Sequence, residues 1–280
     1  MTILGAAILA MLSAQTVPEL TASKAAKLPV LDGKGDDEAW KAAKELVVKT
    51  GLPQEDVKSQ VSLKAVHDGD SICFLAVWPD ESENKTHKLK TWSLSDEKYV
   101  VFDDSEIEDA FTLGFPLEGK FDPDMLAAHE SKWDVWDWGA FRSSGGFAKD
   151  KYHLHTKQAV PNKKGKQFAS RDESPIFITR VYDDGTAPWK EVPAPAAKGP
   201  EKVPSYALQT PTGSAADVKV QAKWADNKWT LEFQRKLNTG NKDDCVLDPA
   251  KPIEFAIATF DSVEKAEHLV SPKLLLKFAK

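Results

Sequence analysis

The sequence predicts an all-β protein, an antiparallel β-sandwich with irregular loop insertions. Two stretches show the strand–turn–strand pattern of a β-hairpin, and long helical periods are scarce. The first hairpin is expected over residues 61–67 and 72–78, joined by the turn Asp68-Gly69-Asp70. The second is expected over residues 218–224 and 229–235. Short strands separated by turn signals are typical of two packed sheets.

The remaining elements follow in chain order. Residues 36–44 are predicted to form one short helical turn, because its acidic start suits a helix N-terminus. Residues 157–171 are a polar, basic excursion. Residues 187–211, rich in Pro, Ala, Lys and Gly, are expected to form an irregular surface loop within one sandwich. Two further strands are expected at residues 253–260 and 273–278.

The N-terminal residues predict export. Residues 3–12 form an uncharged apolar run, followed by Ser13-Ala14-Gln15. The run has the length of a signal-peptide core and is too short to span a bilayer. We therefore expect a signal peptide at residues 1–14 and a single domain at residues 15–280, soluble and periplasmic or otherwise exported. No Lys or Arg precedes the run, and the alternative is an N-terminal helix docked on the domain. No later stretch reaches 18 continuous apolar residues, so no membrane span is expected.

Charge and cysteine content exclude several classes of partner and site. The formal net charge of −6 argues against nucleic acid or an anionic membrane surface as a partner. The two cysteines, Cys73 and Cys245, fit either free thiols or one long-range disulfide. Neither has a C-x-x-C partner, which disfavours zinc, iron–sulfur clusters and covalent haem attachment. No catalytic motif indicates an enzyme with its own substrate.

Residues 125–138 concentrate side chains suited to a haem site. They include Met125, His129 and three of the nine tryptophans, and Met125 is the only methionine outside the first eleven residues. An iron porphyrin accepts thioether and imidazole axial ligands, and flat rings such as Trp136 and Trp138 suit the walls of its pocket. The same residues also fit the core of a strand, with methionine filling a gap.

Several segments, taken in order, resemble one known family over roughly residues 30 to 278. In chain order they are Leu31-Asp32-Gly33, residues 36–42, residues 64–70 with Trp78 and Asp80, residues 133–138 with Arg142 and Gly145, Trp224 with residues 229–237, residues 255–258, and residues 268–271. The first segments resemble sandwich domains related to family 9 carbohydrate-binding modules. Together the segments resemble the ethylbenzene-dehydrogenase-type haem-binding domain family.

The resemblance implies a role as well as a fold. It implies a β-sandwich with one non-covalent haem b, acting as the γ subunit of a periplasmic molybdenum oxidoreductase of nitrite, chlorate, selenate, dimethylsulfide or hydrocarbon type. Such a subunit is not itself an enzyme. It relays electrons between a molybdenum catalytic subunit with its iron–sulfur subunit and an external redox partner such as a c-type cytochrome. Two alternatives remain, a carbohydrate-binding module-like sandwich without haem and a free-standing periplasmic haem shuttle.

The resemblance also implies the axial ligands. Met125-Leu-Ala-Ala128-His129 stands where covalent relatives have C-x-x-C-H, so no thiol is available to attach the haem. The b-type members use Met and Lys, and here either Met125 or His129 is the first axial ligand. His268 stands at the position of the lysine, with Lys265 as a fallback. A neutral imidazole is available near neutrality, whereas lysine must lose a proton against a pKa of about 10.4.

Overall fold

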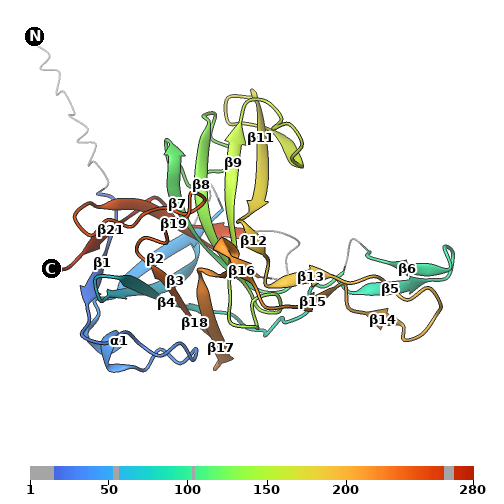
Figure 1. The fold of residues 1–280 in the computed structure, drawn as a ribbon, viewed down its shortest axis with the longest axis horizontal. Coiled ribbons are helices and arrows are strands. Elements are labelled where there is room, and N and C mark those ends of the chain that lie inside the picture. Colours follow the sequence, from blue (N-terminus) through green and yellow to red (C-terminus); the bar gives the residue numbers. More distant parts are fainter. Residues whose placement is uncertain (1–15, 53–56, 103–104, 262–267) are drawn as a thin grey trace, which may run out of the picture.

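The computed structural model describes residues 16–52, 57–102, 105–261 and 268–280 (Figure 1). Its elements are almost all strands. In chain order they are β1 (Glu19–Lys24), α1 (Glu38–Ala42), β2 (Leu46–Gly51), β3 (Val57–His67), β4 (Ser71–Pro79), β5 (Lys90–Ser93), β6 (Lys98–Val100), β7 (Ala110–Gly119), β8 (Ser131–Gly139), β9 (Lys149–Thr156), β10 (Gly165–Ala169), β11 (Pro175–Tyr182), β12 (Gly185–Thr186), β13 (Trp189–Glu191), β14 (Lys202–Val203), β15 (Tyr206–Leu208), β16 (Thr212–Gly213), the 3-10 turn η1 (Ser214–Ala216), β17 (Lys219–Ala225), β18 (Lys228–Lys236), β19 (Ile253–Phe260), β20 (His268–Val270) and β21 (Leu274–Phe278).

One continuous sheet folds over on itself into two packed layers. Its strand order is β10-β11-β9-β8-β7-β19-β20-β2-β3-β4-β18-β17, and every pair along this path is antiparallel. The first layer runs from β10 to β19 and the second from β2 to β17. Strand β1 pairs in parallel with both β21 and β3, and so joins the layers. The predicted antiparallel sandwich is confirmed, with β1 as a parallel exception that was not anticipated.

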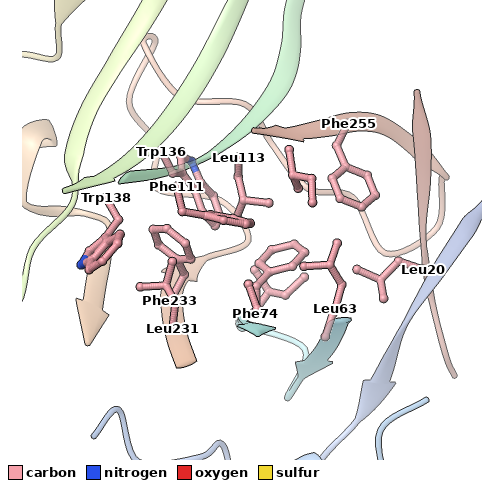
Figure 2. Close-up of a cluster of buried hydrophobic side chains, with 14 of the residues drawn as sticks. Leu20, Leu63, Phe74, Phe111, Leu113, Trp136, Trp138, Leu231, Phe233 and Phe255 are labelled. Atoms are coloured by element: carbon pink, nitrogen blue, oxygen red, sulfur yellow. The ribbon is translucent and has the colours of Figure 1, made fainter. Parts of the chain in front are cut away.

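Aromatic and aliphatic side chains from both layers fill the space between them (Figure 2). Phe74 of β4 lies at the centre, with its ring centroid 6.1 Å from that of Phe115 on β7 and 5.8 Å from that of Trp136 on β8. Trp136 is fully buried, and Trp138 is 2% exposed. The core therefore has the close packing expected of two facing sheets.

Both predicted hairpins form, and each has a physical cause at its turn. Between β3 and β4, the Asp68 carboxylate accepts hydrogen bonds from the N–H groups of Asp70 and Ser71, at 2.9 and 2.8 Å. Between β17 and β18, Asp226 and Asn227 both have positive φ, 53° and 55°. Two such residues make the two-residue turn whose twist matches that of the strands it joins.

The prediction of an irregular loop at residues 187–211 is wrong, and the polar excursion at 157–171 contains a strand. Residues 187–211 contain three short strands: β13 pairs with β15, and β14 pairs with β5. The rings of Trp189 and Tyr206 hold the β13–β15 pair together at a centroid distance of 5.0 Å. The polar excursion at 157–171 ends in β10, which pairs with β11. Both regions lack hydrophobic alternation because their strands are short and mostly exposed.

The structure also bears on the predicted helix, the two C-terminal strands, the cysteines and the membrane span. The helical turn is confirmed as α1, and the strands expected at 253–260 and 273–278 are confirmed as β19 and β21. Cys73 and Cys245 are buried free thiols. No helix among the described residues is long and apolar enough to cross a membrane. The predicted signal peptide, residues 1–14, lies outside the described residues, and the single-domain boundary at residue 15 stays a prediction.

A buried carboxylate ties the N-terminal segment to the second layer. Glu232 on β18 is fully buried and accepts three hydrogen bonds, from the N–H groups of Asp32 (3.0 Å) and Gly33 (2.7 Å) and from Trp40 Nε1 (2.7 Å). Gly33 has φ 74°, and a Cβ there would lie 2.7 Å from the backbone carbon of Ala222. The turn therefore needs glycine, and its free N–H groups need Glu232.

The substitution Glu232→Ala is expected to lower the free energy of unfolding by about 3 kcal/mol, because three donors lose their acceptor in a site that excludes water. Chemical denaturation followed by tryptophan fluorescence measures this loss. Glu254→Ala is the matched control, since Glu254 forms a surface ion pair with Lys273 (3.0 Å) and should cost less than about 1 kcal/mol. Equal losses in the two variants would contradict the role of Glu232.

Candidate functional site

Strand β8 divides the predicted site residues between the two faces of its sheet. Because side chains alternate along a strand, Trp136 and Trp138 point into the sandwich core, and Trp133 and Val135 point to the opposite side. We call the side of the β19-β7-β8-β9 sheet that carries Trp133 and Val135 the outer face. Met125 packs against this side. The structure thus brings Met125 together with Trp133 rather than with Trp136 and Trp138.

The loop between β7 and β8 carries Met125 over the outer face. Met125 is half-buried and packs against a small apolar cluster of Phe121, Trp133, Val135 and Ala256. Arg171, in the turn between β10 and β11, makes two hydrogen bonds to this loop. Its Nη2 atom donates to Asp124 Oδ1 at 3.1 Å, and its backbone N–H donates to the carbonyl oxygen of Leu126 at 2.9 Å. These two contacts bracket Met125 and fix the backbone on either side of it.

His129 and His268 lie at different edges of this region. The Nε2 atom of His129 lies 3.0 Å from the carbonyl oxygen of Lys120, which holds the ring near the surface. His268 is half-buried on β20, and its ring stacks on that of Phe260 at 5.1 Å and 18°. His268 and Phe260 are register partners and share the outer face with Ala258. Lys265, the fallback ligand, lies outside the described residues.

A strip of small residues runs along the outer face between Met125 and His268. It consists of Gly114 on β7 with Ala256 and Ala258 on β19, and Gly114 pairs directly with both Ala256 and Val135. A Cβ atom added at Gly114 would meet no other atom within 4 Å. Most strand positions in a sandwich are crowded, so the surface of the sheet is unusually open at Gly114.

Two buried imidazoles lie beside Trp133 on the same face. His153 pairs with Trp133 and His155 with Ser131. Burial lowers the pKa of His155 to about 4 and that of His153 well below its usual value, so both rings are neutral at pH 7. Among the described residues, neither ring nitrogen of His153 has a hydrogen-bond partner, and His155 Nε2 has none. A neutral imidazole always carries one N–H donor, and these atoms would be satisfied by a bound polar group.

The i, i+2 spacing of His153 and His155 can build a metal site, but no carboxylate or cysteine lies beside them in the sequence, which disfavours one. The structure likewise brings no group of three or more metal-ligating side chains together around them among the described residues. What the spacing did not reveal is that both rings are buried, because alternation alone does not say which face is covered.

The far end of the outer face is charged rather than apolar. Asp137 lies between Lys149 (3.1 Å) and Lys151, and Glu108 forms ion pairs with Arg142 and Lys149. Burial lowers the pKa of the Lys151 ammonium to about 8, while the nearby lysines hold the pKa of Asp137 below its usual range despite its burial. This network was not anticipated from the sequence, and it marks the boundary of the apolar part of the face.

A cavity of about 360 Å³ lies elsewhere, on the second layer near Gly33 and Gly35. It is lined by strands β4, β17 and β18 and does not include any residue of the outer face. Its lysines, Lys34, Lys223 and Lys228, give it a polar rim, and none of the predicted ligands reaches it. The outer face therefore remains the candidate site.

Fold and site define a two-layered β-sandwich with an apolar face flanked by thioether and imidazole side chains. A family model described as "Ethylbenzene dehydrogenase" matches residues 37–270, and the chain belongs to this family. The family is associated with subunits of molybdenum oxidoreductase complexes and with haem b. Comparison with curated proteins finds no match.

The chain is also similar to two solved structures at low sequence identity. A family 9 carbohydrate-binding module from Caldicellulosiruptor kristjanssonii, in complex with cellotriose, has 9% sequence identity and a TM-score of 0.40, and the alignment covers 93% of each chain. A putative carbohydrate-binding protein from Bacteroides uniformis has 10% identity and a TM-score of 0.46, with 94% of this chain and 100% of that chain covered.

The residues of the outer face fit the haem b associated with the family. Axial ligation needs soft sulfur or nitrogen donors, and Met125 and His268 are such donors. The porphyrin needs space and apolar walls, which the opening at Gly114 and the cluster around Trp133 supply. The buried ring nitrogens of His153 lack partners among the described residues, as expected where a polar group of a ligand belongs.

Proposed function

We propose that the chain is an electron-transfer subunit that holds one non-covalent haem b on its outer face. Met125 and His268 are the proposed axial ligands, with His129 as the alternative to Met125. The observation that carries the proposal is that Met125 and His268 flank one strip of small residues that is open above Gly114. Trp136 and Trp138 support the face from beneath, inside the core.

The chemistry of such a site follows from its side chains. A bound haem b supplies a reversible one-electron couple. The thioether of Met125 stabilises ferrous over ferric iron more than a second imidazole would, so the Met125–His268 pair implies a higher potential than a His129–His268 pair. Trp133 and Phe121 exclude water from the Met125 side, which also favours the less charged state. His153 is positioned to donate or accept a hydrogen bond there.

Attachment without covalent links agrees with the positions of the two thiols. Cys73 lies on β4 in the second layer, and Cys245 lies in the loop after β18 beside Arg235. Burial raises the pKa of Cys73 to about 12, and that of Cys245 is raised as well, so both thiols stay protonated. The outer face therefore offers ligands for a haem but no thiol to bond to it.

In this role the chain relays electrons between a molybdenum catalytic subunit with its iron–sulfur subunit and an external redox partner such as a c-type cytochrome. The sandwich is proposed to work in the periplasm or another exported location. Co-purification of a molybdenum subunit supports this assignment over a free-standing haem shuttle. The carbohydrate-binding alternative was based on exposed tryptophans, and none of the nine tryptophans, all within the described residues, is exposed. Exposed aromatic rings are present at Phe102 and Tyr182.

An absorption spectrum with a pyridine haemochrome assay tests the cofactor on protein produced with ample haem. A b-type spectrum with one haem per chain is expected. Gly114→Val should abolish the spectrum while leaving the unfolding midpoint within a few degrees, because valine suits a strand and fills the opening. Gly145→Val is the matched control at an exposed turn with equal space, and it should retain haem. Haem retained in Gly114→Val would reject the outer face.

The axial ligands are tested separately by spectroscopy of the ferric protein. Met125→Ala is expected to remove the near-infrared charge-transfer band of a methionine-ligated haem and to lower the potential. His268→Ala should convert the spectrum to that of a five-coordinate or weakly ligated haem. His129→Ala should change neither property. If His129→Ala instead produces the effect expected of Met125→Ala, the alternative assignment holds.

A further inference from the structure

Four buried aspartates gather on the core side of the first layer, away from the outer face. Asp134 on β8, Asp150 on β9 and Asp244 in the loop after β18 place carboxylate oxygens within 4.8 Å of one another. Their side chains are almost completely buried, at 0%, 1% and 5% exposure. Asp183, directly after β11, is 4% exposed, and its N–H lies 3.3 Å from the carbonyl oxygen of Asp150. We call these residues the four-aspartate cluster.

The cluster has too little positive charge among the described residues. Its one ion-pairing cation there is Arg235, whose Nη1 lies 2.6 Å from Asp134 Oδ2 and 3.2 Å from Asp244 Oδ1. Four carboxylates thus face a single guanidinium. Burying one unpaired carboxylate is already costly, and three in excess at one site call for another source of positive charge.

Five carboxylate oxygens of the cluster have no hydrogen-bond partner among the described residues. They are both oxygens of Asp150, both oxygens of Asp183 and Oδ1 of Asp134. The remaining oxygens are satisfied: Asp134 Oδ2 accepts from the Cys245 N–H at 2.8 Å, and Asp244 Oδ2 accepts from Thr239 Oγ1 at 2.5 Å. These five oxygens are buried, and Asp134 and Asp150 each present a carboxylate oxygen to the same small volume as Asp244.

We propose that the four-aspartate cluster is a structural Ca²⁺ site, with the bare oxygens of Asp134, Asp150 and Asp183 as ligands and Asp244 completing the set. Ca²⁺ accepts six to eight oxygen ligands in flexible geometry, including carboxylates that bind through both oxygens. Mg²⁺ retains several waters in a strict octahedron, which suits a fully buried carboxylate cluster less well. Zn²⁺ prefers nitrogen and sulfur donors, and the only sulfur nearby, Cys245 Sγ, lies against Arg235 at 3.5 Å.

The bound ion would connect parts of the chain that are not joined by hydrogen bonds between strands. Asp134 and Asp150 lie on neighbouring strands, whereas Asp183 directly follows β11 and Asp244 belongs to the loop that leads from β18 of the second layer. One cation bound to all of them links both layers at this end of the sandwich. The site stands independently of the proposed haem, because it lies on the opposite face of β8.

Protonation is the competing way to remove the excess charge. Burial and the neighbouring carboxylates raise the pKa of Asp183 to about 9 and that of Asp244 to about 6, and they raise the pKa of Asp150 as well. The charged groups that face this site are Asp134 on β8, Asp243 and Asp244 in the loop after β18, and Arg235 on β18. A raised pKa in the fold means that the metal-free protein takes up protons on folding, so its stability should fall as the pH rises from about 4 to about 9.

Metal content and thermal stability test the proposal. The full chain is refolded with and without CaCl₂, dialysed against metal-free buffer, and assayed for bound metal by elemental analysis and for its melting temperature at pH 6 and pH 8. One Ca²⁺ per chain is expected, with a rise in melting temperature of about 5 °C at saturating Ca²⁺. Terbium luminescence excited through tryptophan provides a second readout, since Trp136 lies beside Arg235.

Two variants separate a metal site from a set of shared protons. Asp150→Asn and Asp183→Asn are expected to lose the bound Ca²⁺ and the Ca²⁺-dependent rise in melting temperature. Without metal they should be as stable as the parent chain or more stable, because asparagine has a similar shape and cannot carry a buried negative charge at any pH. Asp248→Asn, at a surface ion pair with Lys251, is the control and should keep the Ca²⁺ response. A parent chain with no bound Ca²⁺ and no response at pH 8 would overturn the proposal, whatever the result for haem.

Discussion

Replacing Arg235 with methionine is expected to lower the free energy of unfolding by about 3–5 kcal/mol in metal-free buffer, because it leaves a buried carboxylate cluster without its cation. The guanidinium is 1% exposed and pairs with Asp134 and Asp244. It also lies over the ring of Trp136, with Cζ 4.5 Å from the ring centroid. Methionine can occupy the apolar part of this space but cannot neutralise the carboxylates.

Urea denaturation at several pH values measures the effect. The carboxylates of the variant should have still higher pKa values than in the parent chain, so the variant should lose further stability as the pH rises toward 9 and regain part of it at pH 5. Arg171→Met provides the control, because Arg171 pairs with Asp124 at a partly exposed site and should cost less than about 1 kcal/mol. A loss in Arg235→Met no greater than in this control would show that the cluster does not depend on its guanidinium.

Trp136→Ala is expected to lower the free energy of unfolding by about 3–5 kcal/mol, because it empties the centre of the sandwich core. The ring of Trp136 lies 5.0 Å from that of Phe115, 5.8 Å from that of Phe74 and 6.3 Å from that of Phe233. These partners belong to three strands in both layers, so a collapse around the missing ring would have to move the layers relative to each other (Figure 2).

The same variant distinguishes a core role from a pocket role for Trp136. Because its ring lies on the core side of β8, the folded fraction of Trp136→Ala should still bind one haem per chain. Trp92→Ala is the stability control, since Trp92 is half-buried and packs mainly against Tyr99 at 5.1 Å. Normal stability together with complete loss of haem would instead place Trp136 in contact with the cofactor.

The sequence predicts those strands of the sandwich whose position depends on neighbouring residues in the chain. The two hairpins combine alternation with turn residues of clear preference, and β19 was predicted with its observed bounds. The parallel pairing of β1 could not be predicted, because it depends on strands far away in the chain. The strands within 187–211 were missed because they are two or three residues long and held by pairs such as Trp189 with Tyr206.

The candidate site could be predicted in part. Met125 was singled out as a candidate axial ligand beside Trp136 and Trp138, whereas the tryptophan that it packs against is Trp133. Its role as a ligand stays a prediction. Alternation separates Trp133 from Trp136 and Trp138, yet both faces of β8 are apolar, so the sequence did not indicate which face meets the core. The four-aspartate cluster was hidden among 43 acidic residues, since its members are close only after four separate segments pack together.

The parallel pairing of β1 also constrains the order in which the chain can fold. Glu19 pairs with Leu275, and Ala22 of the same strand pairs with Ala65, so the first described strand bridges an early hairpin and the last strand (Figure 1). Closing so long a loop is slow and costs chain entropy. Until β21 has docked, the edges of β1 and β19 remain open to pairing with other chains. We therefore expect the pairing of β1 with β21, near the two ends of the described chain, to form late in folding.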